Sequence, residues 1–458
     1  MTVTEQPSLT GSSEFAERVL DVLNSGMLAL MISIGHRSGL FDAMAALPPA
    51  TSGRIAQVAG LDERYVREWL AAMTTGRIVD HDPAAMTFTL PPAHAAWLTR
   101  AAGPDNLAVQ AQYVGLLAEV EDDILGCFRD GGGVGYAAFP RFQALMAEDS
   151  GAVHDATLIE VTLPLVSGLV ERLRSGIDVA DVGCGSGHAV NLMGAAFPAS
   201  RFVGFDVSDT GLGAATAEAH RRGLTNVHFV HKDAASLDGT ERFDLITTFD
   251  AVHDQARPDL VLAGIAQSLR PGGVYLCVDV TASSTLADNL DHPLGPFLYT
   301  ISCMHCMTVS LAAGGMGLGT MWGEQTARRM LAAAGFTEVD TKHVDGDILN
   351  TYYIATRSCA RQRHLDGQDP RVGASNRRRF GPPVHGSPTD LRQPDEQSQW
   401  PPAGARSGGT SPGRESWRST QSRCCIDGAA VRPTADRQTH GCRRTLPITW
   451  IVVGTRKP

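Results

Sequence analysis

The stretch from residue 177 to residue 190 constrains the fold most strongly. Ile177, Val179 and Val182 form an apolar run that is typical of a buried parallel strand. Three glycines at alternate positions follow, where the backbone can turn sharply and approach a ligand closely: Gly183, Gly185 and Gly187. A helix then begins, with its first amides pointing back at the glycines. This order predicts a nucleotide-binding crevice at the edge of a parallel sheet.

The residues around the glycines indicate which nucleotide is bound. A dinucleotide fingerprint needs a glycine at position 188, and this chain has His188, which disfavours a nicotinamide dehydrogenase. The next strand, 201–205, runs into Asp206, whose carboxylate can accept hydrogen bonds from both ribose hydroxyls and disfavours a 2′-phosphate. A third strand, 227–230, leads to Asp233, which can accept the amino group of an adenine.

Two further strands follow, at 243–249 and from residue 269 to near residue 280. The series VADVGCGSG, GFD, KDA, FDAVHD and LRPGG, in this order, resembles the class I S-adenosylmethionine-dependent methyltransferases. The resemblance covers about residues 150 to 357. With the segments on either side, it extends to bacterial methyltransferases with an N-terminal winged-helix domain, which are similar in layout to plant small-molecule O-methyltransferases.

The resemblance implies a fold and a cofactor. We expect an α/β, Rossmann-like sheet of seven strands, whose last hairpin, at 335–344 and 351–356, is antiparallel. A mostly α-helical winged-helix domain is expected before it. The implied cofactor is S-adenosyl-L-methionine, with the glycines at its amino acid portion, Asp206 at the ribose and Phe249 beside the sulfonium. The expected cofactor-binding residues are Asp181, Gly183, Cys184, Gly185, Gly187, Asp206, Val207, Asp233, Ala234 and Phe249.

His253 is the candidate catalytic base. It directly follows the fourth strand on the cofactor side of the crevice, and an imidazole can take a proton from a hydroxyl near neutral pH. It matches the histidine of the His-Asp-Trp segment of plant O-methyltransferases, although Gln255 replaces the tryptophan. The alternative is that His253 only shapes the pocket, and His305 is a second candidate base. Asp254 could orient His253 or cap the helix that begins near residue 257.

The methyl acceptor is expected under the insert at 281–323, which lies over the crevice and is apolar and rich in sulfur. Three aromatic residues just before a helix, Tyr136, Phe139 and Phe142, could stack on an aromatic acceptor or simply pin that helix to the core. The expected substrate-binding residues are Phe139, Phe142, His305 and Trp322. Cys303 and Cys306 could suggest zinc or redox chemistry, but no second pair stands at the right spacing, so we expect no metal.

The first hundred residues predict a winged helix. Helices are expected from residue 13, at 27–36, and as a helix-turn-helix at 51–60 and 61–73, followed by wing strands at 76–80 and 86–90. DNA binding is one reading. Residues 13–100, however, hold 7 arginines and no lysine against 9 acidic residues. This segment therefore lacks the net positive charge of a DNA-binding surface. Pairing of subunits and closure over the substrate is the favoured role.

Composition changes abruptly at residue 359. The last hundred residues hold 17 Lys plus Arg against 8 Asp plus Glu, whereas the first 358 hold 22 against 41. The tail is dominated by arginine, proline, glycine and serine, which predicts disorder and a dispensable segment rather than an RNA-binding arm. We see no signal peptide and no apolar stretch longer than 27–34, which favours a cytoplasmic protein without a membrane partner.

These observations predict a disordered start (1–12), a winged-helix dimerisation and lid domain (13–100), linking helices (101–150) and a methyltransferase domain (151–358). The glycine run at 131–135 is expected to be a flexible joint. The favoured function is O-methylation of a small apolar or aromatic hydroxylated metabolite by a homodimer. The alternative is a methyltransferase-like transcriptional regulator that binds DNA through the winged helix.

Overall fold

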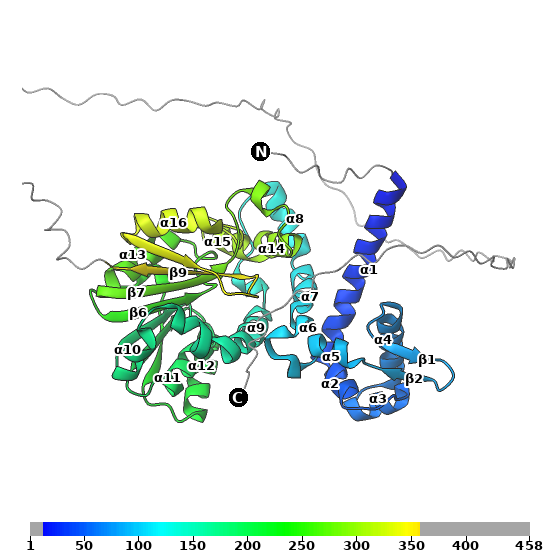
Figure 1. Cartoon of the computed structure of the whole chain (residues 1–458). Helices are drawn as coiled ribbons and strands as arrows, with labels where there is room; N and C mark the ends of the chain where they lie inside the picture. Colours follow the sequence, from blue (N-terminus) through cyan, green and yellow to red (C-terminus); the bar gives the residue numbers. More distant parts are fainter. Residues whose placement is uncertain (1–11, 358–458) are drawn as a thin grey trace, which may run out of the picture. The chain divides into compact units, whose positions relative to one another are not determined.

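A computed structural model describes residues 12 to 357. The predictions for residues 1–11 and for the tail from residue 359 onward lie outside these described residues. Among the described residues the chain forms a small antiparallel sheet, a seven-stranded sheet and the helices around them (Figure 1).

The large sheet confirms the predicted fold class. Its strand order is β5-β4-β3-β6-β7-β9-β8, with parallel pairing from β5 through β7 and antiparallel pairing of β9 with both β7 and β8. The order reverses direction between β3 and β6, which opens a crevice at the carboxyl ends of these neighbours. The strands are β3 (Asp178–Val182), β4 (Arg201–Asp206), β5 (Val227–His231), β6 (Phe243–Phe249), β7 (Leu269–Val280), β8 (Glu338–Lys342) and β9 (Asn350–Thr356).

Helices cover both faces of this sheet (Figure 1). On one face α13 (Pro258–Ser268) and α16 (Gly323–Ala333) bury Leu262 and Leu331. On the other face α10 (Leu169–Ser175) and α11 (His188–Ala196) bury Leu173 and Met193. Helix α12 (Asp209–Arg221) packs beside α11. The central strands are apolar on both faces because both are covered.

The helix-turn-helix prediction is confirmed. Helix α3 (Ser52–Ala59) is capped by Thr51 and ends at Gly60, which has a left-handed φ of 68°. Helix α4 (Glu63–Thr75) follows, capped by the Asp62 side chain. The other helices of this region are α2 (Leu40–Ala45) and α5 (Pro92–Leu98).

Two local predictions for this domain were wrong. The helices expected from residue 13 and at 27–36 are one continuous helix, α1 (Ser12–Arg37), which runs through Gly26 without a break because a single glycine weakens a helix but does not end it. The first wing strand begins later than predicted. Ile78 and Val79 donate to the Met73 carbonyl as a helix-end turn, so the wing pairs only β1 (Asp80–Asp82) with β2 (Thr87–Thr89).

The length of α1 changes one more expectation. The longest apolar stretch in the sequence of this region is 27–34, but residues 13–37 form one helix that is long and apolar enough to span a membrane by these two criteria alone. Soluble core helices can pass the same criteria.

Short helices connect the two domains and build the insert. The connecting elements are η1 (Arg100–Asp105), α6 (Leu107–Gln110), α7 (Gln112–Ala118), α8 (Glu121–Asp130), η2 (Tyr136–Ala138), α9 (Phe142–Thr157), η3 (Leu158–Thr162) and η4 (Leu163–Leu165). A short η5 (Ala234–Ser236) follows β5, and the insert contains η6 (Leu286–Asn289), α14 (Gly295–Ile301), the π-helical η7 (Ser302–Cys306) and α15 (Met307–Ala312).

The glycine run at 131–135 packs against this insert. The Val134 amide donates to the Thr308 hydroxyl over 2.8 Å, and a Cβ on Gly133 would stand 2.0 Å from the Thr308 carbonyl oxygen. Gly133 is therefore a close-packing contact. The prediction of a flexible joint addressed motion and stays a prediction.

We expect Gly133→Ala to lower the free energy of unfolding by about 1–3 kcal/mol, because the backbone of α15 would have to move away from the added methyl group. Gly135→Ala is the matched control, since a Cβ there would meet nothing within 4 Å. Chemical denaturation of the two variants measures the difference. Equal stability of the two variants would contradict the packing seen at Gly133.

Candidate active site

The glycine loop has the geometry expected of a cofactor cradle. Gly183, Gly185 and Gly187 all have left-handed backbone angles, with φ of 76°, 53° and 68°. A Cβ on Gly187 would stand 2.5 Å from the Ala215 methyl group, so this glycine seats α11 on α12. A Cβ on Gly185 would meet nothing within 4 Å. The middle of the loop therefore has open space for a ligand to approach the backbone.

Asp206 stands at the end of β4, as predicted, and is fixed by the loop. Its Oδ2 accepts the Gly185 amide over 2.8 Å, and its Oδ1 accepts the Ser208 amide over 2.8 Å. These bonds hold the carboxylate half-exposed beside the glycines while each oxygen keeps a lone pair for a further donor. This is the arrangement that a pair of ribose hydroxyls would need.

The residues predicted for the adenine lie on the next strand end. Asp233 is exposed and caps η5 by accepting the Ala235 amide over 2.9 Å, while Ala234 is buried. The cap uses Oδ1 of Asp233 and leaves its other oxygen for an amino group. Val207, just after Asp206, is 57% exposed and is available to contact a base.

Three more predicted cofactor residues lie at or near the carboxyl ends of β3 and β6. Asp181 is buried, accepts the Thr247 hydroxyl over 2.7 Å, and has its pKa raised to about 7 by burial. Cys184 follows Gly183, and both amides donate to the Phe205 carbonyl. The Phe249 ring lies edge-on to His154, 4.8 Å between centroids.

His253 forms a buried pair with Asp279 of β7. Its Nδ1 lies 2.7 Å from Asp279 Oδ1, and the two side chains are 5% and 0% exposed. Burial, the largest single effect, lowers the pKa of His253, but the Asp279 carboxylate and the Cys306 thiol together raise it well above the ordinary value. Because this bond uses Nδ1, Nε2 is the ring nitrogen left for another partner, and the imidazole also interacts with the Cys306 thiol.

Asp279, not Asp254, orients the histidine. Asp254 accepts the Tyr136 hydroxyl instead, and α13 has no side-chain cap, so both readings of Asp254 were wrong. Sequence reasoning missed Asp279 although a signal existed, because it is a carboxylate in an otherwise apolar strand, and buried carboxylates are rare unless paired. Trp322 also donates to Asp279 Oδ1, over 3.1 Å. Trp322 thus lies in the core and supports the pair.

The structure gathers the other three predicted acceptor residues. The Phe142 ring stacks on His305 at 3.5 Å between centroids, and Phe139 meets the same ring edge-on at 4.7 Å. The Tyr136 ring also lies edge-on to His305, at 5.5 Å between centroids. His305 lies on the π-helical turn and is fully buried with both ring nitrogens unpartnered, and burial lowers its pKa to about 3. Its neutral ring behaves as part of an aromatic wall.

Helix α9 links the aromatic wall to the cofactor loop. Near its start, Gln143 accepts the Ser208 hydroxyl over 2.7 Å, and near its end Asp155 lies 2.9 Å from His188. The other ring nitrogen of His188 lies 2.9 Å from Glu218. A histidine at this position thus joins α11 to α9 and α12, a role that a glycine could not fill.

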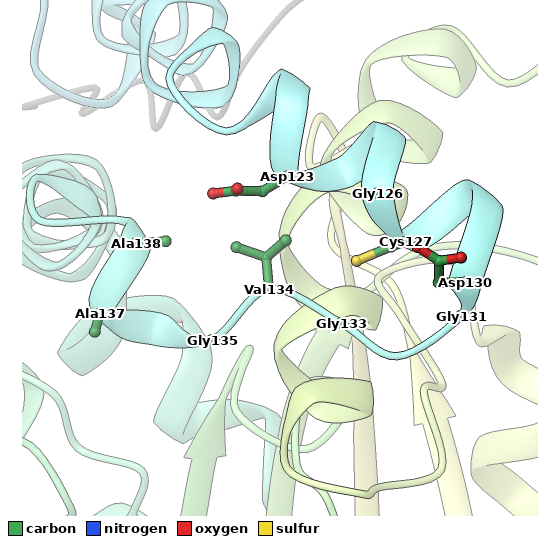
Figure 2. A pocket seen from close by; sticks show the side chains of 10 residues that line it. All are labelled: Asp123, Gly126, Cys127, Asp130, Gly131, Gly133, Val134, Gly135, Ala137 and Ala138. Atoms are coloured by element: carbon green, nitrogen blue, oxygen red, sulfur yellow. The ribbon is translucent and has the colours of Figure 1, made fainter. Parts of the chain in front are cut away.

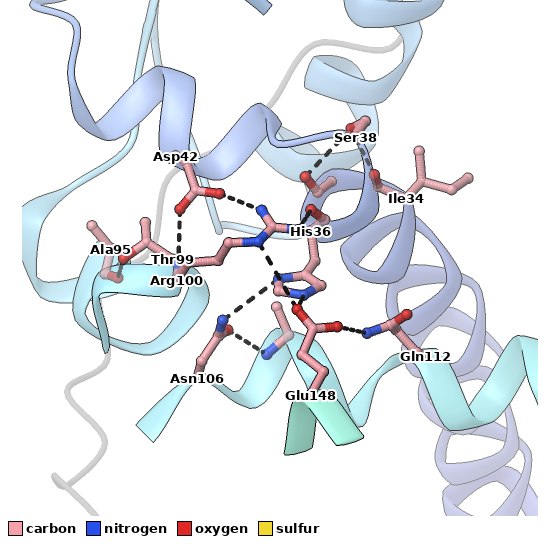
Figure 3. Close-up of polar contacts among 12 residues, drawn as sticks. Ile34, His36, Ser38, Asp42, Ala95, Thr99, Arg100, Asn106, Gln112 and Glu148 are labelled. Atoms are coloured by element: carbon pink, nitrogen blue, oxygen red, sulfur yellow. Dashed lines mark hydrogen bonds and ion pairs between the residues drawn. The ribbon is translucent and has the colours of Figure 1, made fainter. Parts of the chain in front are cut away.

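The same helix is tied to the winged-helix domain (Figure 3). Buried His36 lies 2.9 Å from Glu148 of α9, and Gln112 donates to the other oxygen of Glu148 over 3.1 Å. Arg100 donates to the His36 carbonyl and pairs with Asp42. These contacts join the end of α1 to α9, the helix that also contacts Ser208 and His188.

One group among residues 12–357 has the spacing of metal ligands. The ligand atoms of Asp250, His253 and Asp279 lie within 4.8 Å of one another. Cys303 and Cys306, considered from sequence, are free thiols and belong to no such group in this part of the chain.

A surface hollow of about 540 Å³ lies apart from these residues (Figure 2). It is lined by the end of α8 and the glycine run, with Asp123, Cys127 and Asp130 as its polar side chains. None of the predicted site residues lines it. Its lining consists of short side chains and glycine backbone. It carries no catalytic constellation.

The fold and this set of residues define a class I S-adenosylmethionine-dependent methyltransferase domain preceded by a winged helix. Comparison with protein families agrees. Residues 26–100 match the family described as the Rv2258c-like winged HTH domain, and residues 173–335 match a methyltransferase domain family. The chain therefore carries a class I S-adenosylmethionine-dependent methyltransferase domain with an N-terminal winged helix-turn-helix domain.

Known relatives extend this picture. The chain is 30% identical over 105 residues to a fatty-acid O-methyltransferase of Mycolicibacterium smegmatis, covering 23% of this chain and 37% of the relative. It is 34% identical over 130 residues to the nocamycin O-methyltransferase of Saccharothrix syringae, covering 26% and 45%. The matched segment thus spans less than half of these relatives. Human N-acetylserotonin methyltransferase, solved with S-adenosylmethionine, shares the fold at a TM-score of 0.56 and 16% identity, over 78% of this chain and 100% of that one.

Proposed function

We propose that the protein transfers a methyl group from S-adenosylmethionine to a hydroxyl group of a small, apolar or aromatic metabolite, with His253 as the general base. The observation that carries the proposal is the buried pair of His253 and Asp279, formed just beyond the end of β6 and on β7 of the sheet that also carries the glycine loop. When bound, S-adenosylmethionine supplies an activated methyl group.

The residues of the chain fit that cofactor. Gly185 leaves open space at the loop, and the Asp206 carboxylate is fixed beside it at the end of β4. Asp233 with Ala234 would hold the adenine, Asp181 the amino group, and Phe249 the sulfonium side. The chain aligns the acceptor and excludes water, and His253 Nε2 takes the hydroxyl proton.

Incubation with methyl-labelled S-adenosylmethionine and fractionated metabolite extracts tests this proposal. We expect label in a product that is heavier than its precursor by one CH₂ and resistant to the base treatment that cleaves methyl esters. Label only in base-labile esters would instead indicate carboxylate methylation. Absence of labelled product, with cofactor binding retained, would contradict the proposed acceptor class.

The regulator alternative finds less support. On α4, which would enter a DNA groove, Arg64 pairs with Glu68 and Arg67 with Glu63. These arginines are therefore neutralised on the helix surface, where a DNA reader needs free positive charge. A mobility-shift assay with genomic fragments at low salt would reveal specific binding if this alternative were correct.

We also propose that two copies pair through α1. Phe15, Val19, Leu23 and Met27 recur every fourth residue, which places them along one stripe, and each is at least 41% exposed. An apolar stripe of this length on a soluble enzyme indicates a protein partner. We take the partner to be a second copy of this chain, because the same apolar stripe on two copies can pack against itself about a twofold axis.

Leu23→Glu is expected to convert the dimer to a monomer, because it places a charge in the centre of the apolar stripe. Sedimentation velocity at micromolar concentration measures the change. Asp21→Asn, on the opposite side of the helix, serves as the control and should remain dimeric. A wild-type protein that sediments as a monomer would refute the pairing.

A further inference from the structure

Two buried carboxylate oxygens in the active site have no hydrogen-bond partner. Asp279 is fully buried, and its Oδ1 accepts from His253, Trp322 and its neighbour's amide, whereas its Oδ2 accepts from nothing. Asp250 Oδ1 is also buried and unpartnered. A ligand atom of Asp250 and one of Asp279 lie within 4.8 Å of each other, so the two carboxylates are neighbours in the fold.

The electrostatic surroundings of this region call for a positive charge. Besides Asp279, the carboxylates that raise the pKa of Asp250 are Asp149 and Asp347, and His253 acts on it in the opposite direction. Within the described chain, no lysine or arginine lies within ion-pair distance of Asp250 or Asp279. Burial, and then the charge of Asp279, raise the pKa of Asp250 to about 7. A buried pair of this kind is costly unless a cation or a proton joins it.

The position of Asp250 is fixed between the cofactor loop and the base. It follows β6 directly, its amide donates to the Val278 carbonyl, and its φ of 50° is unusual for a residue other than glycine. The next residue, Ala251, lies so close to the loop that a Cβ on Gly183 would stand 2.6 Å from its methyl group. Asp250 therefore stands where the donor and the acceptor of a methyl group would meet.

We propose that Asp250, together with the free oxygen of Asp279, is a recognition site for the sulfonium cation of the methyl donor. This inference rests on the proposed function. It assigns to Asp250 the discrimination between the charged donor and the neutral product of methyl transfer.

A divalent metal ion fits the same residues less well. The bond between His253 Nδ1 and Asp279 Oδ1 occupies both atoms, so Asp250 Oδ1 and Asp279 Oδ2 are the unpartnered carboxylate oxygens of this group. Magnesium and calcium take six or more oxygen ligands, so two carboxylate oxygens would leave most of the coordination shell to water. The single, diffuse positive charge of a sulfonium needs no such coordination shell, and both carboxylates attract it.

The proposal has a consequence for turnover. Methyl transfer breaks the sulfur–methyl bond, forms the oxygen–methyl bond and sends the hydroxyl proton to His253. The sulfur thereby becomes neutral, and its attraction to Asp250 and Asp279 is lost. The site would bind S-adenosylmethionine more tightly than S-adenosylhomocysteine and so favour exchange of product for fresh donor.

Titration calorimetry with both ligands on the full chain tests this assignment. For the wild type we expect S-adenosylmethionine to bind about tenfold or more tightly than S-adenosylhomocysteine. In Asp250→Asn most of this preference should vanish through weaker binding of S-adenosylmethionine, with the affinity for S-adenosylhomocysteine nearly unchanged. Asparagine is chosen because it tolerates the left-handed backbone. Asp259→Asn, which removes an exposed carboxylate bonded to Arg257, should keep the wild-type preference.

Each other outcome is distinct. Binding of both ligands without a preference, or with a preference that Asp250→Asn retains, overturns the role of Asp250 and leaves the proposed function intact. Failure of the wild type to bind either ligand overturns the proposed function as well.

Titration of the chelator-treated protein with Mg²⁺ alone should show no binding. Tight Mg²⁺ binding that Asp250→Asn abolishes would replace the sulfonium assignment with a metal site. A thermal melt of each variant confirms that it is folded.

Discussion

Replacement of His253 by asparagine is expected to lower kcat for methyl transfer by about 100-fold or more, the usual contribution of a positioned general base. The asparagine amide can still donate to Asp279, as His253 Nδ1 does over 2.7 Å, so the local structure should persist. It cannot take a proton at the position of Nε2. Binding of S-adenosylhomocysteine should therefore remain close to that of the wild type while turnover is lost.

The pH dependence follows from the same pair. The Asp279 carboxylate raises the pKa of His253, and a histidine acts as a base only when it is neutral. The rate should consequently rise with pH through a value above the ordinary histidine range and be lost as pH falls below it. His253→Asn should lack this rise. A variant with wild-type kcat, or a wild-type rate that is flat between pH 6 and pH 9, would show that His253 only shapes the pocket.

Replacement of Asp206 by alanine is expected to weaken binding of S-adenosylhomocysteine by about 100-fold, since charge-assisted hydrogen bonds contribute a few kcal/mol. The carboxylate is held beside the loop by the amides of Gly185 and Ser208, so its loss also frees the loop. Calorimetric titration gives the affinity. Asp209→Asn, three residues further on and exposed, controls for the change in charge. Unchanged affinity in Asp206→Ala would remove the ribose assignment.

Much of the fold could be predicted from the sequence because its signals are local. The strand, glycine turn and helix at 177–190 and the apolar runs that follow it specify the parallel sheet, and β9 pairs antiparallel as expected. The sequence predicted two helices that meet near residue 26, but the chain forms one helix there. A glycine inside a helix lowers its stability without ending it, so the residue type alone does not locate a helix boundary. The wing register depended on a helix-end turn at residues 78 and 79, which short patterns do not show.

The candidate site was only partly predictable. His253 and Asp206 follow strand ends, and strand ends can be located from sequence. The partner of His253 could not be identified by proximity in the chain, because Asp279 lies 26 residues away on the adjacent strand. Trp322, expected in the acceptor pocket, instead donates to Asp279 because the start of α16 packs over the end of β7. Contacts of this kind depend on tertiary packing rather than on local pattern.

The measurement that tests the account most directly is a calorimetric titration of the purified chain with S-adenosylhomocysteine and, separately, with NAD. The loop at 183–187 and the Asp206 carboxylate predict one S-adenosylhomocysteine bound per chain and no heat from NAD. Binding of NAD with no response to S-adenosylhomocysteine would contradict the account at its base.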